Sequence, residues 1–472
     1  MGRYLKNILM GVLFSTASLL ASSIPDGLAL EISDIPLNKN NYSIHIQAVD
    51  SENPVADWRT HTKRTPASVM KLLTTYSALL ELGFDYRWET KFFYTGRIIN
   101  GVLKGDLYVK ASGDPTLATE HLYDISSQVR AAGISKIQGN IIIDRTLFKV
   151  SSKNNSGFDN NIYSPYNAMP DAIMFNKRKS TVCITPHSKR ATIHKDVPDK
   201  SYKVVNKLKM VNGSCRRGQS WPKVRIKTNV SSRSTVYLSG KLSKRCGKRT
   251  ICKVISMPHR AFYYAFRARL KSLGVHMTGG LKLKRVPRKA NYLFSHYSEP
   301  LEQVISTIAK KSDNLMARQL MLTLGAKSYT PPSTTYKSRK AIENILNRHY
   351  ILEKGSTFIA NGSGLSRSSK LTAKSLANLL NHGARTYGQR WMDTLATAGI
   401  DGTIRRRFAN SIVFGRAWMK TGTIKKVKNI AGYVEGSSGR RYVVVVLVND
   451  KYAYKYGAKL ANRVIKWVVT SL

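Results

Sequence analysis

The apolar and polar positions near the start of the chain follow two different spacings. Residues 43–50 (SIHIQAVD) alternate between apolar and polar side chains, which predicts a β-strand. After residue 68 the apolar positions recur every three or four residues, which predicts a helix that continues to Leu82. Ser68 is therefore expected in the first turn of a mostly buried helix, whose apolar positions are Val69, Leu72, Leu73, Tyr76, Leu79 and Leu80.

Between residues 87 and 289 the helical spacing gives way to short β-like runs. Turns rich in Gly, Asn, Ser and Lys separate these runs, and one helix is expected at 261–273. The pattern predicts a β-rich insertion of one or two modules. The expected strands are 88–99, 105–110, 137–144, 182–186, 224–228 and 235–240.

The last third of the chain combines helical and β-type spacing. One strand near the start of the chain and three near its end can form a single antiparallel sheet flanked by helices. The predicted fold class is α/β of the α+β type, with one domain (residues 30–86 and 290–472) interrupted by the β-rich insertion at 87–289. The expected helices are 301–310, 314–324, 375–382, 389–397 and 454–469, and the expected strands are 413–420, 429–435 and 441–449.

The N-terminus has the features of an export signal. Two basic residues precede an apolar run at 8–21, which is shorter than the roughly 20 residues of a membrane span. Small-residue cleavage sites follow at 21–23 and 27–29. We therefore expect a signal peptide within residues 1–29 and an exported protein.

Export predicts an oxidising compartment, in which cysteines can pair. No CxxC pair and no neighbouring His cluster is present, so a zinc site is not expected. The predicted chemistry needs neither a metal nor another cofactor. The four cysteines are Cys183, Cys215, Cys246 and Cys252.

The positive charge of the chain is large and unevenly distributed. The net charge is +50, and residues 86–289 hold 41 Lys and Arg against 10 Asp and Glu. Such a field favours polyanions, such as an acidic wall polymer or an anionic membrane surface, although no specific nucleic-acid partner is expected. A general compositional bias toward basic residues accounts for the same numbers, so both interpretations stay open.

Three short motifs occur in a fixed order: Ser68-Val-Met-Lys71, Ser312-Asp-Asn314 and Lys420-Thr-Gly422. Each motif alone is weak, but the ordered set is the signature of serine β-lactamases and penicillin-binding proteins. A serine hydroxyl needs an adjacent base, and residues three apart on a helix share a face. Lys71 can therefore deprotonate Ser68 if burial and a second cation, such as Lys420, lower its pKa.

The remaining motif residues have expected roles around this pair. The backbone N–H groups of Ser68 and Thr423 are the candidate oxyanion donors. Ser312 is expected to relay a proton to the leaving amine, and Asn314 to orient Lys71 and bind the substrate amide. The strand Lys420-Thr421-Gly422-Thr423 is expected to pair with an extended peptide, with Lys420 and Thr421 holding its terminal carboxylate.

The chain resembles the D-alanyl-D-alanine carboxypeptidase/endopeptidase family of low-molecular-mass penicillin-binding proteins. The similar segments extend from about residue 43 to the C-terminus, and one departure is Asn361, where the family usually has Asp. They are 66–74, 112–117 (SGDPTL), 311–315, 361–367 (NGSGLSR), 399–405, 420–423 and 431–433.

The resemblance implies a transpeptidase/β-lactamase-like domain in the periplasm that acts on peptidoglycan peptides. The family reaction removes terminal D-alanine or cuts cross-bridges, and β-lactam antibiotics acylate the serine. Family members often carry cysteines at the positions of Cys215 and Cys246, each beside a glycine turn, which favours a Cys215–Cys246 disulfide. A pair between Cys183 and Cys252 is a further possibility.

Two alternative functions belong to other classes. A serine β-lactamase shares the motifs, but 244 positions separate Ser68 from Ser312, which is long for a compact lactamase. A non-enzymatic basic wall-binding protein would not be labelled by penicillin. The sequence leaves open the preference between carboxypeptidase and endopeptidase activity, the oligomeric state and what the basic insertion binds.

Overall fold

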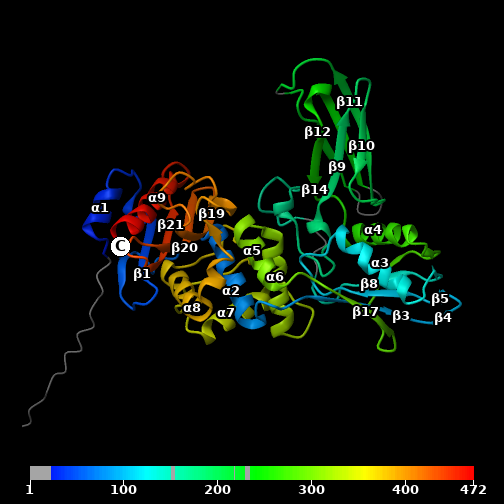
Figure 1. The fold of residues 1–472 in the computed structure, drawn as a ribbon, viewed down its shortest axis with the longest axis horizontal. Helices are drawn as coiled ribbons and strands as arrows, with labels where there is room; N and C mark the ends of the chain where they lie inside the picture. The colour runs from blue at the N-terminus through cyan, green and yellow to red at the C-terminus, as the bar shows by residue number, and fades with distance from the viewer. Residues whose placement is uncertain (1–22, 150–154, 217, 229–233) are drawn as a thin grey trace, which may run out of the picture.

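The computed structural model describes residues 23–149, 155–216, 218–228 and 234–472 (Figure 1). Most of the expected signal peptide lies outside these residues. Within them, helix α1 (Asp26–Ile32) packs against helix α9 (Ala453–Ser471), and its Leu28 side chain is fully buried. Cleavage at 27–29 would cut through α1, whereas cleavage at 21–23 would leave it intact. No helix in the described part of the chain is long and apolar enough to cross a membrane.

A six-stranded antiparallel sheet forms the centre of the first body of the molecule. The N-terminal strand β1 lies between β2 and the C-terminal strand β21, as the sequence predicted for one early and three late strands. Strand β19 begins four residues later than the expected strand at 413–420. The strand order is β18 (Ala396–Thr397), β19 (Ala417–Ile424), β20 (Val427–Glu435), β21 (Arg441–Asn449), β1 (Tyr42–Ala48) and β2 (Pro54–Trp58).

Helices cover both faces of this sheet, which explains the continuous apolar run in β21. Val443, Val445 and Leu447 point into one hydrophobic cluster, while the alternate residues Val444, Val446 and Val448 point into another with α1 and α9. The first cluster is shared with α2 (Met70–Leu82), α5 (Leu301–Lys311), α6 (Asn314–Ser328), α7 (Thr335–Arg348) and α8 (Ala373–Met392).

Two of these helices differ from the sequence expectation. Helix α7 was not predicted, because its apolar positions are few among many polar residues. The expected helix 375–382 and the start of the expected helix 389–397 form one element, α8, which is interrupted at Gly388 (φ 55°, ψ −135°). The rest of the second expectation is wrong, because α8 ends at Met392 and residues 396–397 form strand β18.

The insertion begins with a mixed α/β module. Its main sheet has the order β16-β8-β6-β3-β17, and helices α3 (Leu122–Ala131) and α4 (Pro258–Ser272) share its hydrophobic core. Strand β17 (Asn291–Tyr297) pairs with β3, so the insertion continues beyond the boundary expected at residue 289. The remaining strands of the main sheet are β3 (Glu89–Tyr94), β6 (Leu107–Lys110), β8 (Ile141–Asp144) and β16 (Leu281–Leu283). The module also contains β4 (Arg97–Ile99), β5 (Val102–Lys104), β7 (Lys136–Ile137) and β15 (His276–Met277), which form a second sheet.

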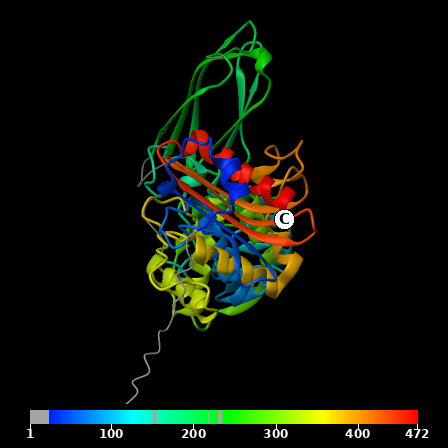
Figure 2. The same ribbon diagram turned by 90° about the vertical axis from the view of Figure 1, so that its left-hand side faces the viewer.

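A second module, called here the sandwich, stands out from the rest of the molecule (Figures 1 and 2). It consists of two three-stranded sheets, of order β10-β9-β14 and β11-β13-β12, that enclose their own small hydrophobic core. Its strands are β9 (Ser180–Pro186), β10 (Ala191–Lys195), β11 (Tyr202–Val211), β12 (Lys223–Lys227), β13 (Ser234–Ser243) and β14 (Arg249–Lys253).

The cysteines all lie in the sandwich. Cys215 and Cys246 form the disulfide that the resemblance implied. The second expected pair is wrong, because Cys183 and Cys252 are free thiols. They lie on neighbouring strands, but Cys183 is opposite Thr250 and Cys252 is opposite Thr181, so the two are diagonal neighbours. Such a diagonal separates the two residues by about 7–8 Å, whereas the Cα atoms of a disulfide are usually about 5.5–6 Å apart.

Candidate active site

The first motif lies where a short 3₁₀ turn (Ala67–Val69) leads into α2. Ser68 and Lys71 share one face of this segment, and Lys71 Nζ is 3.0 Å from Ser68 Oγ. Lys71 Nζ also donates hydrogen bonds to Asn314 Oδ1 (2.7 Å) and to the Ser363 carbonyl oxygen (2.7 Å). The lysine is therefore held in a fixed position between the serine and two oxygen acceptors.

The loop that supplies the Ser363 carbonyl approaches α2 very closely. A Cβ atom on Gly364 would lie 1.8 Å from the carbonyl oxygen of Ala67, and this glycine has a φ of +72°. Only glycine fits this position, because it lacks a Cβ and tolerates positive φ. The sequence showed the NGSGLSR segment but gave no sign that its backbone binds the lysine.

The environment of Lys71 favours its neutral form. Complete burial lowers the pKa of Lys71 well below its usual value, and repulsion by the nearby Lys420 lowers it further. The Asp313 carboxylate acts in the opposite direction but does not reverse the shift. A lysine with a lowered pKa is neutral over a wider pH range and can then accept a proton from Ser68.

The second motif forms the corner between α5 and α6. Ser312 has a left-handed backbone (φ 54°, ψ 38°) that ends α5, and Asp313 caps α6 by accepting hydrogen bonds from the N–H groups of Leu315 and Met316. The central aspartate therefore has the capping role. The two flanking side chains, Ser312 and Asn314, contact Lys420 and Lys71 instead.

Lys420 of the third motif completes the polar network. Its Nζ donates to Ser312 Oγ (3.1 Å) and to the Thr421 carbonyl oxygen (2.8 Å). The side chain is fully buried, and burial lowers its pKa to about 7. The two lysines thus connect all three motifs, since Lys71 contacts Ser68 and Asn314 while Lys420 contacts Ser312.

The strand β19 lies directly against the Ser68 turn. A Cβ on Gly422 would lie 2.8 Å from the Pro66 carbonyl oxygen and 2.9 Å from the Ser68 nitrogen, so this close approach requires glycine. The Asn429 side-chain amide donates to the carbonyl oxygens of Thr65 (3.0 Å) and Pro66 (2.9 Å), which fixes the chain just before Ser68. The sequence did not single out Asn429, because it belongs to no recognised motif.

One edge of β19 is open beside the serine. On the side away from β20, strand β18 pairs only with Trp418 and Met419, and no other described strand pairs with residues 420–424. Ser68, Ser312, Thr421 and Thr423 line a cavity of about 370 Å³ at this edge. Thr403 and Arg407, which the sequence did not identify, also line it, and Thr421 Oγ1 donates to Thr403 Oγ1.

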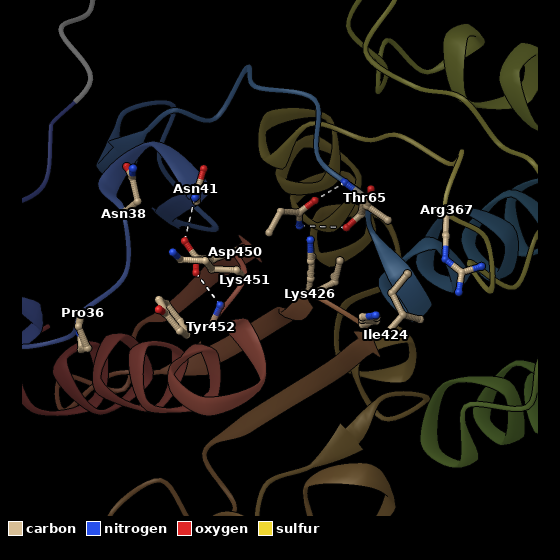
Figure 3. Close-up of a pocket in the computed structure, with 13 residues that line it drawn as sticks. Pro36, Asn38, Asn41, Thr65, Arg367, Ile424, Lys426, Asp450, Lys451 and Tyr452 are labelled. Atoms are coloured by element: carbon tan, nitrogen blue, oxygen red, sulfur yellow. Dashed lines mark hydrogen bonds between the residues drawn. The ribbon is translucent and has the colours of Figure 1, made fainter. Parts of the chain in front are cut away.

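A larger cavity of about 670 Å³ lies next to the motifs (Figure 3). Thr65, three residues before Ser68, and Ile424, directly after Thr423, are among its lining residues. Arg367, Lys426 and Lys451 supply positive charge, while Asp450 accepts a hydrogen bond from the Asn41 side chain (Figure 3). Ser68, Ser312, Thr421 and Thr423 line the smaller cavity, and the larger cavity begins at their chain neighbours.

Asn361 replaces the aspartate that is usual in the resembled family without breaking the loop. Its Oδ1 accepts hydrogen bonds from the Ser363 hydroxyl (2.7 Å) and N–H (3.3 Å), as a carboxylate would. Its Nδ2 adds a hydrogen bond to the Leu365 carbonyl oxygen (3.1 Å), which a carboxylate could not donate. The loop that binds Lys71 therefore keeps its internal contacts.

The fold and this arrangement of motifs define the class of serine acyl-transfer enzymes that comprises penicillin-binding proteins and serine β-lactamases. Within this class, the chain belongs to the D-Ala-D-Ala carboxypeptidase 3 (S13) family, whose model matches residues 26–467. The match covers both the helix-flanked sheet and the insertion.

Individual relatives agree with this assignment. The chain is 24% identical over 435 residues to the D-alanyl-D-alanine carboxypeptidase DacB of Haemophilus influenzae, covering 90% of each protein. It is similar in fold to penicillin-binding protein 4 (dacB) from the same organism, with a TM-score of 0.77, 23% identity and coverage of 93% of this chain and 99% of the other. The penicillin G-acylated Bd3459 predatory endopeptidase of Bdellovibrio bacteriovorus matches with a TM-score of 0.51 and 17% identity, covering 92% of each chain.

Proposed function

We propose that this protein is a serine-type D-Ala-D-Ala carboxypeptidase and endopeptidase that cleaves peptidoglycan peptides through an acyl-enzyme on Ser68. The observation that carries the proposal is the hydrogen bond between Lys71 Nζ and Ser68 Oγ in a member of the S13 family. Substrates of this kind occur in the periplasm, so we place the protein there.

In the proposed acylation step, neutral Lys71 takes the proton of Ser68 as Oγ attacks the carbonyl carbon of the penultimate D-alanine. The N–H groups of Ser68 and Thr423 stabilise the oxyanion. Lys71 passes this proton on to Ser312, which is hydrogen-bonded to Lys420 and gives its own proton to the leaving amine as the C–N bond breaks, so Lys71 is neutral again. Water then attacks the ester and gives one proton to Lys71, which returns it to Ser68 Oγ as the acyl–oxygen bond breaks.

The same geometry gives the substrate a direction. Lys420 and Thr421 hold the terminal carboxylate, and the scissile carbonyl lies between Ser68 and Thr423. The acyl part of the peptide therefore continues past Thr423 toward Ile424 and the larger cavity (Figure 3). This cavity has room for the rest of a stem peptide, and its basic residues suit the carboxylates of such peptides.

Penicillin resembles the acyl-D-alanyl-D-alanine end, so we expect it to acylate Ser68 and to turn over slowly. The penicillin G-acylated endopeptidase of Bdellovibrio supports this expectation. The serine β-lactamase alternative is disfavoured, because the family is one of carboxypeptidases and the chain contains the same long insertion as its carboxypeptidase relatives.

The proposal is tested with purified protein and two substrates. Purified cross-linked and uncross-linked muropeptides are incubated with the enzyme and with Ser68→Ala, and the products are identified by mass spectrometry. Loss of D-alanine, or cleavage of the D-Ala cross-bridge, is expected only with the unaltered enzyme. The proposal is overturned if neither product forms, or if fluorescent penicillin labels a residue other than Ser68.

A further inference from the structure

The β11–β13–β12 sheet of the sandwich has one face in the core and one face in solvent. Val236, Leu238 and Leu242 of β13 are buried in the sandwich core. The alternate positions point to the other face, and the strand registers align them across the sheet. Seven exposed cations share this face, which we call the basic face: Lys203, Lys207 and Lys209 of β11, Lys223, Arg225 and Lys227 of β12, and Lys241 of β13.

The cations of the basic face form rows across the sheet. Lys207 and Lys223 are both opposite Ser239, and Lys203 and Lys227 are both opposite Thr235. Lys209 is directly opposite Lys241. Like charges directly opposite each other destabilise a sheet, so the Lys209–Lys241 pair costs stability that a bound polyanion would restore.

Carboxylates are scarce in the surrounding sequence, and the nearest before β11 are Asp196 and Asp199. Residues 200–298 include 25 Lys and Arg but not a single Asp or Glu. A bias of composition alone would raise the number of basic residues. In β11 and β12, however, the alternation also places every basic residue of these two strands on the solvent face. The basic face is therefore a set of exposed cations on one sheet of a module that protrudes from the molecule (Figure 2).

The far end of the sandwich adds an exposed aromatic side chain. Trp221 is 54% exposed and lies two residues before Lys223 of the basic face. The Cys215–Cys246 disulfide and the hydrogen bond from Ser243 N–H to the Gln219 carbonyl oxygen (2.9 Å) fix this end, which we call the tip (residues 213–216, 218–221 and 244–249). Exposed cations among these residues are Arg216, Lys244, Arg245 and Lys248.

We propose that the tip and the basic face dock on a lipid bilayer that contains anionic phospholipids. The cations attract the headgroup phosphates, and the Trp221 indole enters the interface between headgroups and acyl chains. The surface is an open sheet face whose single charges are spread over rows rather than gathered in a groove, which suits mobile headgroups. The Arg249 guanidinium lies over the Trp221 ring, 5.9 Å from its centroid, but the side chain stays 54% exposed. A soluble linear polyanion would satisfy the charges but would not bury this exposed apolar area.

Docking of this kind leaves the catalytic cleft free. None of the residues of the basic face or of the tip lines the cavity at Ser68. The enzyme would thus be held at the bilayer while its active site stays open to wall peptides. Binding and catalysis are separable, so failure of this proposal and failure of the proposed enzymatic function are distinguishable.

The experiment measures flotation of the full-length exported protein with vesicles. Phosphatidylcholine vesicles with and without 30% phosphatidylglycerol, roughly the content of an anionic membrane, are compared at low and high salt. We expect binding only to the anionic vesicles and its loss at high salt. The triple variant Lys207→Gln/Lys223→Gln/Arg225→Gln should bind about 100-fold more weakly, because each cation near such a surface contributes about a factor of five.

The matched control removes the same number of exposed cations from the catalytic body: Lys63→Gln/Lys354→Gln/Lys466→Gln. This control should bind vesicles nearly as well as the unaltered protein, and both triple variants should keep full penicillin labelling. A second variant, Trp221→Ala, should weaken vesicle binding but not binding to soluble polyphosphate.

Three results would overturn the proposal. Equal losses in the two triple variants would mean that only the total charge matters. Unchanged vesicle binding by Trp221→Ala, with tight binding to polyphosphate, would assign the surface to a soluble polyanion instead. Absence of binding to anionic vesicles at low salt would exclude a lipid partner altogether.

Discussion

Lysine side chains are buried in the catalytic cleft but exposed to solvent in the sandwich. Lys71 and Lys420 are completely buried, bound to oxygen acceptors, and have lowered pKa values. The lysines of the basic face are exposed to solvent on an open sheet. A buried lysine can lose its proton and take part in proton transfer, whereas a solvated one contributes only charge.

The comparison also shows how each region is held in place. The cleft depends on close backbone approaches at Gly364 and Gly422, which admit no side chain. The sandwich encloses a small core and adds a disulfide. We therefore expect substitutions in the cleft to affect chemistry most, and changes to the sandwich to affect stability and binding instead.

The largest expected effect is the loss of the base. Lys71→Ala should slow acylation of Ser68 by penicillin about 10²–10⁴-fold, because Ser68 then has no proton acceptor. Stopped-flow measurement with a fluorescent penicillin gives the rate, and Lys63→Ala serves as the control for removing a lysine from the surface. Acylation of Lys71→Ala at an undiminished rate would show that another group is the base.

Loss of the disulfide in the sandwich should lower the free energy of unfolding without changing the acylation of Ser68. Replacing Cys215 and Cys246 by Ser opens a loop of 31 residues, which lowers the free energy of unfolding by about 3–4 kcal/mol in the chain-entropy model. Chemical denaturation measures this change, and the acylation rate of Ser68 should not change. The matched control replaces the free thiols Cys183 and Cys252 by Ser and should be nearly neutral; a similar loss there would contradict the stabilising role of the disulfide.

Lys420 offers a test of charge inside the cleft. Lys420→Ala should lower kcat/KM. The expected loss of transition-state stabilisation is on the order of 2–4 kcal/mol, the range for loss of one strong donor to a reacting group. Since the pKa of Lys420 is about 7, the lysine loses its charge as the pH rises above that value, and its binding to the substrate carboxylate should weaken. Lys420→Arg stays charged, so this alkaline decline should disappear; a decline of the same size in both proteins would assign it to another group.

The buried Lys420 also links stability to pH. Its pKa is lower in the folded protein than the usual 10.5, so the unfolded chain binds more protons between about pH 7 and pH 10.5. The free energy of unfolding should therefore rise with pH in this window. Thermal melts should show a smaller rise for Lys420→Met.

The sequence predicted the central fold well because its signals are strong and local. The alternation at residues 43–50 and the apolar runs of β20 and β21 identify strands that are buried on at least one face. Helix α7 was not predicted because its stability depends on tertiary contacts of one narrow apolar stripe, which includes Ile342 and Ile345. The end of the insertion was misplaced because β17 is defined by its pairing with β3, which no local pattern reveals.

The site shows the same division between local and long-range information. The three motifs pointed to Ser68, Lys71, Ser312, Asn314 and Lys420, and the structure brings these residues into one network. The Ser363 carbonyl and the Asn429 amide could not be predicted, because a backbone oxygen has no sequence signature and Asn429 acts through a fold contact. The glycines of the NGSGLSR segment were the sequence signal for this contact. Why a glycine is needed becomes evident only when a Cβ atom is placed on Gly364 in the structure.

The smallest expected effect concerns Asn361, which supports the loop behind Lys71. Asn361→Asp keeps the two hydrogen bonds from Ser363 and loses the bond to Leu365, which should lower the free energy of unfolding by about 0.5–1.5 kcal/mol. The new carboxylate favours protonated Lys71, so the acidic limb of the acylation rate should move to higher pH. Asn361→Ala loses all three bonds and should be less stable than Asn361→Asp, without the shift in pH. Thermal melts and acylation rates measured from pH 5 to 9 separate these effects; equal losses in both variants would show that the loop depends on the amide donor and not on the acceptor.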